Sequence, residues 1–302
     1  MKNKTLIVSM AVMLLWGSLF PMVKLGYSVF GISALGDILA FAGMRFLICG
    51  GVITLFCLVK NPAACRISKR ELLPVLLCGL FSVILHYAFT YTGLQLTGGS
   101  KTAILKQLGA VFYICFSAAF FADDKLTWQK MLGLLLGIGG IVAINTGAGG
   151  ISFHMGDLLI VAASFCTVFA NVAGKRATQT VAPIVMTGVS QLFGGIVLLA
   201  LGIAFGGKVT AVVPKTTAQI GVFGGIVLAS TVSYCLWYAV VQKEKLSKLF
   251  IIKFSEPLFA AVFSWLLLKE NVWRINYLAA FLLISGGIVL ANISKKQNKL
   301  PE

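Results

Sequence analysis

The sequence predicts an all-α integral membrane protein in which ten transmembrane helices form two inverted repeats of five helices. Three observations predict this fold. Of the 302 residues, 59% are hydrophobic and 11% are charged, which leaves too few polar residues to cover the surface of a soluble domain. Ten apolar segments follow one another along the chain, each near the roughly 20 residues that a helix needs to cross a bilayer. The second half of the sequence also repeats the first without a gap.

The expected helices are separated by short turns, none of which could hold a soluble domain. The spans lie near residues 5–27, 34–59, 72–96, 99–121, 127–146, 155–174, 182–205, 217–241, 247–268 and 273–293. Turn-forming residues mark several connections, including Asn61-Pro62, Gly206-Gly207 and Pro214. The first span is longer than a signal peptide and has no small-residue cleavage site, so we expect it to be retained.

The repeat is clearest in two segments that lie 147 positions apart. Residues 100–123 read SKTAILKQLGAVFYICFSAAFFAD and residues 247–270 read SKLFIIKFSEPLFAAVFSWLLLKE, so that Lys106 aligns with Lys253. The same register pairs further polar residues: Tyr87 with Tyr234, Tyr91 with Tyr238 and Gln95 with Gln242. Chance similarity of two apolar tracts would not align lysines and tyrosines in this way, and the pattern indicates an internal duplication.

The repeat and the basic residues together predict the topology. With five spans in each half, the second copy enters the membrane from the side opposite to the first. We expect the first repeat over residues 1–147 and the second over residues 148–302. Lys and Arg near the spans number sixteen on the side of the N-terminus and six on the other side. Because these residues gather on the cytoplasmic side, we expect a multi-pass protein of the plasma or inner membrane with both termini in the cytoplasm.

The distribution of polar residues argues against several function classes. The net charge is +16, but the basic residues are scattered between apolar segments rather than gathered in a stripe, which argues against nucleic-acid binding. The seven cysteines occur singly, without the paired spacing of a metal site. No glycine cluster has the strand-loop-helix context of a phosphate-binding loop. We therefore expect no cofactor, no metal ion and no enzyme activity.

Four charged residues lie well inside the apolar spans rather than near their ends: Arg45, Lys106, Lys253 and Glu256. An ionisable side chain at the centre of a transmembrane helix costs roughly 3 kcal/mol or more, so such residues usually face a cavity, a partner or a substrate. Three cations against one acid leave a positive field that a carboxylate or phosphate group would satisfy. Lys106, Lys253 and Arg45 are candidate anion ligands, and Glu256 is expected on the same helix face as Lys253, which is therefore either a second ligand or the partner of Glu256. The alternative is that the two lysines extend to opposite headgroup layers.

Aromatic residues are candidates for the wall of a substrate cavity. Tyr87 and Tyr91 share a helix face because they lie four positions apart, and Tyr234 and Tyr238 repeat the spacing. They either line a central cavity or anchor helix ends at the membrane interface. Trp16 is either a wall of the cavity or a packing residue.

Other polar and helix-breaking residues have more ordinary interpretations. We expect His86 to be a hydrogen-bonded polar group rather than a proton relay. Pro21 and Pro257 interrupt helical hydrogen bonding and are candidate hinges. Asp123 and Asp124 are expected to be solvated caps at a helix end.

Several residues carry a family resemblance: Trp16-Gly17-Ser18 with Phe20 and Lys24, Arg45, Glu256-Pro257-Leu258-Phe259, and the Gly-Gly-Ile-Val ends of the fifth and tenth spans. With the tandem repeat, they resemble the drug/metabolite transporter superfamily, in the branch built from two EamA-type repeats. The resemblance covers nearly the whole chain. It implies a transporter fold and a small-molecule substrate, drawn from a range that includes amino acids, amines, sugars, nucleotide sugars, phosphorylated sugars and drugs.

The surroundings of the two lysines resemble a second pattern. Ile104-Leu105-Lys106 and Ile251-Ile252-Lys253 are similar to the Val-Ile-Lys sequence that carries phosphate-binding lysines in the phosphate-translocator branch. Two positions depart from it, since Gly109-Ala110 replaces Glu-Pro in the first copy and Phe254 stands where that branch has an Arg. The resemblance therefore implies a cationic site more strongly than it implies phosphate binding.

Together these observations predict a secondary transporter of a small organic metabolite that carries a carboxylate or phosphate group. Transport would exchange the substrate or couple it to protons, with Glu256 as the candidate proton carrier, by alternating access between the two repeats. The alternative is an exporter of neutral or aromatic amino acids or drug-like compounds, with the tyrosines and Trp16 as the cavity wall. The expected partners are the substrate and the lipid bilayer, and a homodimer is compatible with this fold.

Overall fold

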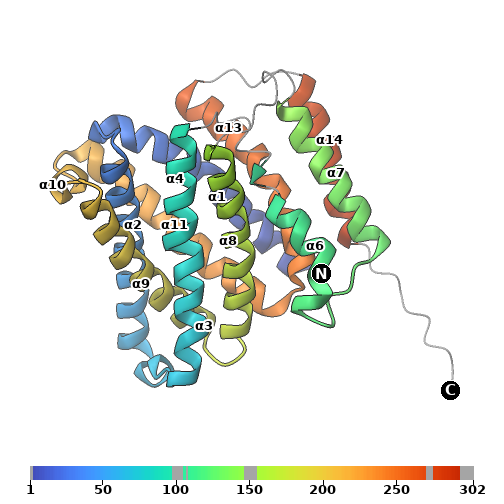
Figure 1. Ribbon diagram of the computed structural model, residues 1–302, viewed down its shortest axis with the longest axis horizontal. Helices are drawn as coiled ribbons and strands as arrows, with labels where there is room; N and C mark the ends of the chain where they lie inside the picture. The colour runs from blue at the N-terminus through green and yellow to red at the C-terminus, as the bar shows by residue number, and fades with distance from the viewer. Residues whose placement is uncertain (1–2, 97–104, 107, 146–154, 270–274, 293–302) are drawn as a thin grey trace.

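The computed structural model describes residues 3–96, 105–106, 108–145, 155–269 and 275–292. Within these residues all of the regular secondary structure is helical, with no strand (Figure 1). The first half contains α1 (Asn3–Phe30), α2 (Leu35–Lys60), η1 (Pro62–Cys65), α3 (Lys69–Gly79), η2 (Leu80–Leu85), α4 (His86–Leu96), α6 (Leu108–Phe120) and α7 (Trp128–Asn145). The second half contains α8 (Met155–Ala177), α9 (Pro183–Ala204), α10 (Val209–Val212), α11 (Thr217–Lys243), α12 (Leu246–Ile252), η3 (Lys253–Ser255), α13 (Glu256–Leu268) and α14 (Ile275–Asn292).

Helical structure occurs at each of the ten predicted stretches. In the described part of the chain, seven helices are long and apolar enough to cross a membrane, and two of these combine several elements, residues 69–94 and 246–268. Shorter apolar helices lie at residues 108–120 and 281–290. The protein is therefore an all-helical, multi-pass membrane protein, and the count of ten crossings stays a prediction.

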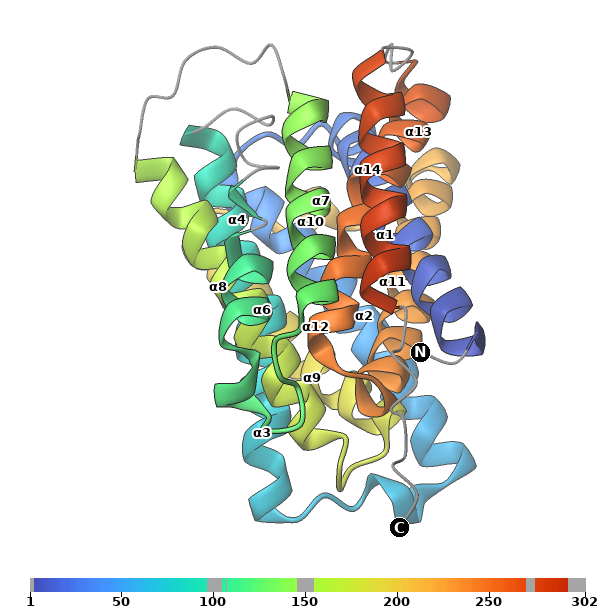
Figure 2. The same ribbon diagram turned by 90° about the vertical axis from the view of Figure 1, so that its right-hand side faces the viewer.

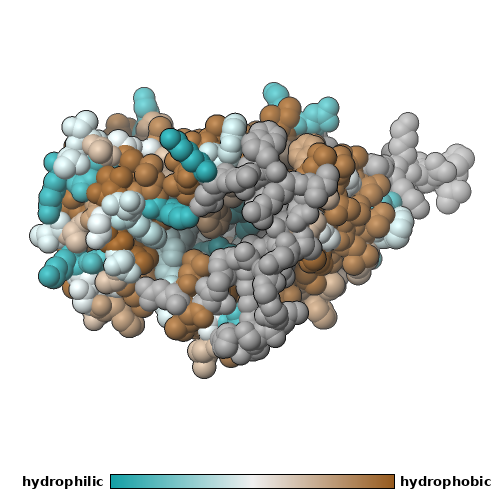
Figure 3. All heavy atoms as spheres, turned by 90° about the horizontal axis from the view of Figure 1, so that it is seen from above, coloured by the Kyte–Doolittle hydropathy of each residue, from teal (hydrophilic) through white to brown (hydrophobic). Residues whose placement is uncertain are grey.

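The outer surface of the helices is apolar, as a bilayer requires. Large hydrophobic side chains such as Ile7, Leu55 and Val59 are 68%, 64% and 73% exposed. Figure 3 shows this hydrophobic covering, with hydrophilic residues gathered toward the left of the view and recessed near its middle. In water such a surface would drive aggregation, whereas hydrocarbon solvates it without penalty.

Contacts between helices follow the sequence repeat. A shift of 147 positions, the separation of Tyr87 and Tyr234, carries α2 onto α9 and α7 onto α14. The structure packs these equivalent helices directly against each other, and α7 and α14 lie side by side in both ribbon views (Figures 1 and 2). The same shift carries α1 onto α8. Helix α1 packs on α11 and α13, whereas α8 packs on their counterparts α3, α4 and α6. This pattern is the one that two repeats related by a two-fold axis would produce.

Glycines allow α2 and α9 to approach closely. A Cβ atom added to Gly50 would lie 2.2 Å from the backbone nitrogen of Leu192, and one added to Gly43 would lie 2.3 Å from that of Leu199. On the facing helix, a Cβ added to Gly195 would meet the nitrogen of Leu47 at 2.3 Å. Small residues of this kind are needed in membranes, where helices associate through close packing rather than through the hydrophobic effect.

A pair of neighbouring glycines tests this packing. Gly50→Ala should lower the melting temperature of the purified protein in detergent, because the two backbones must separate, an overpacking effect of about 1–3 kcal/mol. Gly51→Ala is the matched control, since a Cβ there meets nothing within 4 Å. Its melting temperature should stay the same or rise slightly, because alanine favours helix more than glycine does. Equal destabilisation by the two substitutions would contradict the packing account.

The predicted span that carries Lys253 forms one apolar helical stretch over residues 246–268, and its hydrogen bonding changes at Lys253, close to the interruption expected at Pro257. Helix α12 ends at Ile252, and a 3-10 turn over Lys253–Ser255 leads into α13. Pro257 has no N–H to bond the carbonyl oxygen of Lys253. That oxygen instead accepts the N–H of Glu256, three residues along the chain. Glu256 therefore starts a new helix, and it remains on the same side as Lys253, because residues three apart in a 3-10 turn lie above one another.

Candidate functional site

The two lysines of the repeat both extend to α1. The Nζ of Lys253 lies 5.1 Å from the centre of the Trp16 ring, and the Nζ of Lys106 lies 5.1 Å from the centre of the Phe20 ring. Trp16 and Phe20 are four residues apart in α1 and so share one face of that helix. The ammonium groups are therefore neighbours along one helix face. This arrangement does not match the alternative in which they reach opposite headgroup layers.

Aromatic rings enclose Lys253. Its Nζ also lies 5.7 Å from the ring centre of Trp237 and 5.8 Å from that of Phe250. The Trp16 and Trp237 rings are 4.9 Å apart. An ammonium group over aromatic faces is attracted by their negative charge density, which partly replaces the water that the group has lost. These rings therefore stabilise the ammonium group of Lys253 but do not neutralise its charge.

Glu256 is the acid that attracts both ammonium groups. The two lysines also repel each other, which means that both act within one electrostatic environment. No ion pair joins Glu256 to either lysine among the described residues. His86 lies near Lys106, Lys253 and Arg45, but its Nδ1 is 3.1 Å from the carbonyl oxygen of Ala163 and 3.2 Å from the Oγ1 of Thr167. The histidine is thus a hydrogen-bonded polar group that fastens α4 to α8.

Two equivalent tyrosines meet between the halves of the protein. The hydroxyl oxygens of Tyr87 and Tyr234 are 3.3 Å apart. Residues related by a two-fold axis contact each other only close to that axis, so this pair marks the position where the repeats meet. The Tyr234 ring packs 5.5 Å from Trp16, and the guanidinium carbon of Arg45 lies 5.1 Å from the centre of the Tyr87 ring. A continuous run of contacts therefore joins Lys253, Trp16, Tyr234, Tyr87 and Arg45.

The other two equivalent tyrosines, Tyr91 and Tyr238, lie in different surroundings. The Tyr91 ring lies 5.4 Å from Tyr87 and 6.4 Å from Tyr27, within the same aromatic cluster. Tyr238 is 2% exposed, accepts a hydrogen bond from the Cys78 thiol at 3.1 Å, and packs closely over Gly174. The structure therefore brings Tyr91 to the cluster and places Tyr238 in a packed helix interface.

Sequence reasoning missed Trp237, which the structure places against Lys253. Its indole N–H donates to the Oδ1 of Asn171 at 2.7 Å, so a buried hydrogen bond fixes the ring. In the register of the repeat, Trp237 aligns with Thr90, and a search for duplicated residues passes over it. The available signal was its spacing of three from Tyr234, which places both rings on one helix face.

Asp124 is buried, so the expectation of a solvated cap was wrong for this residue. It is 1% exposed, and its Oδ1 forms a 2.6 Å ion pair with the Nζ of Lys130. Its Oδ2 accepts hydrogen bonds at 3.1 Å from the Tyr113 hydroxyl and the Ser247 backbone N–H. Burial raises the pKa of Asp124, but the hydrogen bonds from Lys130 and Ser247 outweigh it and hold the pKa below its usual range. The neighbouring Asp123 has a side chain that is 74% exposed, as a solvated cap would be.

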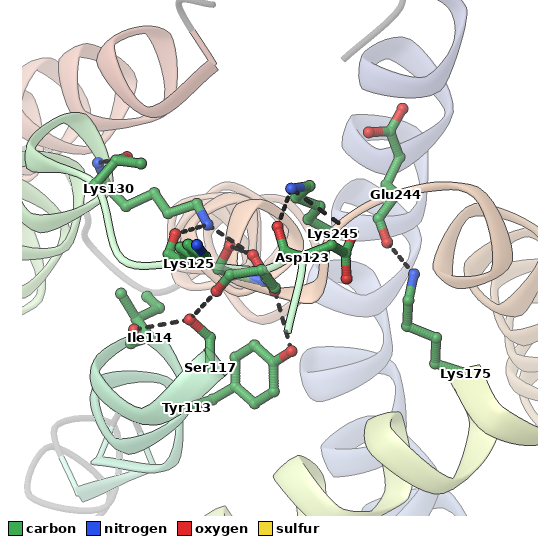
Figure 4. Close-up of polar contacts among 12 residues, drawn as sticks. Tyr113, Ile114, Ser117, Asp123, Lys125, Lys130, Lys175, Glu244 and Lys245 are labelled. Atoms are coloured by element: carbon green, nitrogen blue, oxygen red, sulfur yellow. Dashed lines mark hydrogen bonds and ion pairs between the residues drawn. The ribbon is translucent and has the colours of Figure 1, made fainter. Parts of the chain in front are cut away.

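The Asp124 network joins the two halves of the chain at one end of the helices (Figure 4). Tyr113 and Lys130 belong to the first half, whereas Ser247 lies in the first turn of α12 in the second. Beside it, the Nζ of Lys245 donates to the carbonyl oxygen of Asp123, and the Nζ of Lys175 donates to that of Val241 at 3.1 Å. Polar residues thus close this end of the protein around one buried ion pair.

Comparison with known proteins identifies the family. The model of the EamA-like transporter family matches the chain twice, over residues 3–146 and again over residues 154–292. The chain belongs to the EamA-like transporter family. The double match agrees with the resemblance that the sequence motifs indicated, and it makes this EamA-like protein a membrane transporter rather than an enzyme.

Relatives of this EamA-like transporter carry names that give no substrate. The uncharacterized transporter YetK of Bacillus subtilis (strain 168) is 26% identical over 85% of this chain and 78% of its own length. YoaV, an uncharacterized transporter of the same organism, is 24% identical over 98% of this chain and 99% of its own. The uncharacterized inner membrane transporter YedA of Escherichia coli (strain K12) is 27% identical over 75% of this chain and 72% of its own. A solved crystal structure, 18% identical, superposes with a TM-score of 0.79 over 97% of both chains, which shows a shared fold.

Proposed function

We propose that this EamA-like transporter is a secondary carrier of a small organic metabolite with a carboxylate or phosphate group. The observation that carries the proposal is the position of Lys106 and Lys253. They occupy equivalent sites in the two repeats, and both extend to one face of α1. An anion between them would bind a cation from each half of the protein.

The local charge supports an anionic substrate. Lys106, Lys253 and Arg45 supply three positive charges, whereas Glu256 is the acid that acts on the lysines. A cation inside a bilayer is unfavourable without a partner. Lys binds a carboxylate or phosphate as a compact point charge with three donors, so a bound anion would remove much of this penalty. In a proton-coupled carrier, Glu256 would be the group that exchanges the proton.

The Asp124 network supports alternating access. It ties the two halves together at one end, so opening that end requires the ion pair with Lys130 to separate from Ser247. In the repeat register, Lys130 aligns with Tyr277 and Tyr113 aligns with Ala260. The second repeat therefore lacks the cation and the phenol that hold Asp124. We infer a carrier in which the Asp124 network closes one end of the helices and no equivalent network closes the opposite end.

The expected topology belongs to the same proposal. Repeats over residues 1–147 and 148–302, with opposite orientations, would place the substrate near the axis marked by Tyr87 and Tyr234. The excess of Lys and Arg on one side favours cytoplasmic termini. The name of the relative YedA, an inner membrane transporter, is in keeping with a plasma or inner membrane location.

Matched pairs of compounds test the proposal. Purified protein would be mixed with carboxylic acids and their primary amides, and with sugar phosphates and their parent sugars, and its melting temperature measured. A bound ligand stabilises the folded protein by RT ln(1 + [L]/Kd). We expect stabilisation by at least one anion and not by its neutral counterpart. Stabilisation by neutral compounds alone would contradict an anionic substrate.

A second candidate function has its own supporting observation. Aromatic rings lie beside both lysines, with Tyr234 packed on Trp16 behind them. This surface would also suit an aromatic amino acid or a drug-like compound. In that case the lysines would have a structural role. The same melting measurements separate the candidates, because an aromatic amino acid amide would then stabilise the protein as well as the amino acid does.

A further inference from the structure

Arg45 is a buried cation with unsatisfied hydrogen-bond donors. It lies in α2, is 2% exposed, and has two nitrogens, Nε and Nη2, that find no hydrogen-bond partner in the described part of the chain. The groups that act most strongly on its charge are the tyrosines Tyr87, Tyr91 and Tyr234 and the thiol of Cys49, none of which is a carboxylate. Buried charges in proteins are normally paired, because an unpaired one loses its hydration without compensation.

The two unsatisfied nitrogens lie on one edge of the guanidinium group. Nε–H and the adjacent Nη2–H point in parallel from that edge, which is the fork that binds both oxygens of a carboxylate. The rings around Arg45 approach its guanidinium carbon, Phe46 at 4.2 Å and Tyr87 at 5.1 Å from their centres. These two rings contact the guanidinium group through cation–π attraction, which supplies no hydrogen-bond acceptor to its nitrogens, and the hydroxyl of Tyr91 also lies close to Arg45.

A second unsatisfied donor lies in the same cluster. The hydroxyl of Tyr27, on α1, is buried and has no hydrogen-bond partner among the described residues. The Tyr27 ring is 6.4 Å from Tyr91, which is 5.4 Å from Tyr87, the ring beside Arg45. Arg45 also acts electrostatically on Tyr27. A phenol hydroxyl and a guanidinium edge are both donors that one carboxylate can accept from.

We propose that Arg45, with Tyr27, forms a second anion subsite and that the substrate of this transporter is a dicarboxylate. This inference rests on the proposed anion-carrying function. One carboxylate binds between Lys106 and Lys253, and the other binds the Arg45 fork. The run of contacts through Trp16, Tyr234 and Tyr87 connects the two subsites. Two carboxylates also balance the charge, since three cations and Glu256 leave two positive charges.

Dicarboxylates and their half-amides test the inference, because a half-amide has the same size and one carboxylate fewer. The purified full-length protein would be titrated with succinate, glutarate and adipate and with succinamate, glutaramate and adipamate. For the preferred chain length, we expect the dicarboxylate to bind at least tenfold more tightly. Arg45→Lys keeps the positive charge but loses the fork, so this preference should fall below about twofold while half-amide binding persists. Arg66→Lys, at an exposed position, is the matched control and should retain the preference.

The outcomes separate this inference from the proposed function. If half-amides bind wild-type protein as tightly as dicarboxylates, the second subsite is wrong and the anion carrier stands. If no carboxylate or half-amide binds, both are wrong. If Arg45→Lys fails to fold, Tyr27→Phe decides, because it removes one hydroxyl only. A several-fold smaller preference for the dicarboxylate in Tyr27→Phe supports the subsite, and an unchanged preference contradicts it.

Discussion

Asp124→Asn should lower the free energy of unfolding by about 3–5 kcal/mol, the usual effect of breaking a buried ion pair. The substitution leaves the Lys130 ammonium group, whose side chain is 5% exposed, without its counter-ion. It also weakens the hydrogen bonds from Tyr113 and Ser247 that connect the two halves. Thermal or denaturant unfolding of the purified protein in detergent measures the change. Asp123→Asn is the matched control, since its exposed pair with Lys245 should contribute at most about 1 kcal/mol.

The pH dependence of stability gives the same test a second readout. Because the pKa of Asp124 lies below its usual range in the folded protein, the carboxylate stabilises the fold at neutral pH. That contribution is lost as the pH falls from about 5 through the lowered pKa, because the unfolded state then binds the proton first. Wild-type protein and Asp123→Asn should both lose this stability, and Asp124→Asn should not. Parallel acid curves for all three would contradict the account.

Lys253→Gln should weaken binding of the anionic substrate by on the order of a hundredfold. Removing one partner of a buried charge pair costs about 2–5 kcal/mol, and about 1.4 kcal/mol corresponds to a factor of ten. The aromatic rings around Lys253 carry no formal charge, so they cannot replace the missing ammonium group. Isothermal titration with the anion found in the compound panel measures the affinity.

Lys243→Gln is the matched control for this loss. Lys243 is an exposed lysine in the last turn of α11, and its substitution should leave the affinity unchanged. The neutral members of the compound panel should bind the Lys253→Gln protein no worse than wild type. If the anion binds Lys253→Gln as tightly as it binds wild type, the lysine has a structural role and the aromatic-substrate alternative gains support.

The sequence predicted the helices and the pair of lysines because both leave strong patterns. Apolar segments of bilayer length mark the spans, and a lysine in hydrocarbon is too unfavourable to be retained twice by chance. The ungapped register even identified Tyr87 and Tyr234, whose hydroxyls meet in the structure. An internal duplication identifies equivalent residues in the two repeats. Such residues contact each other only if they lie near the two-fold axis that relates the repeats.

The remaining features depend on packing that no local pattern encodes. Asp124 looked like a helix cap because acids and lysines follow each other at Asp123 to Lys125, yet Lys130 and Ser247 bury it. Trp237 has no counterpart in the first repeat, and Tyr238 copies Tyr91 in sequence but packs over Gly174. By contrast, the break at Lys253 agrees with the interruption expected at Pro257, which removes a donor four residues after it.

A double-mutant cycle on Lys106 and Lys253 tests the central claim most directly. The affinity for the anionic substrate would be measured for wild type, Lys106→Gln, Lys253→Gln and the double variant. If one anion binds between both ammonium groups, the two losses are coupled, and their sum differs from the loss in the double variant by about 1 kcal/mol or more. Losses that add to within about 0.5 kcal/mol would show that the lysines act independently, and would contradict a site shared between the two repeats.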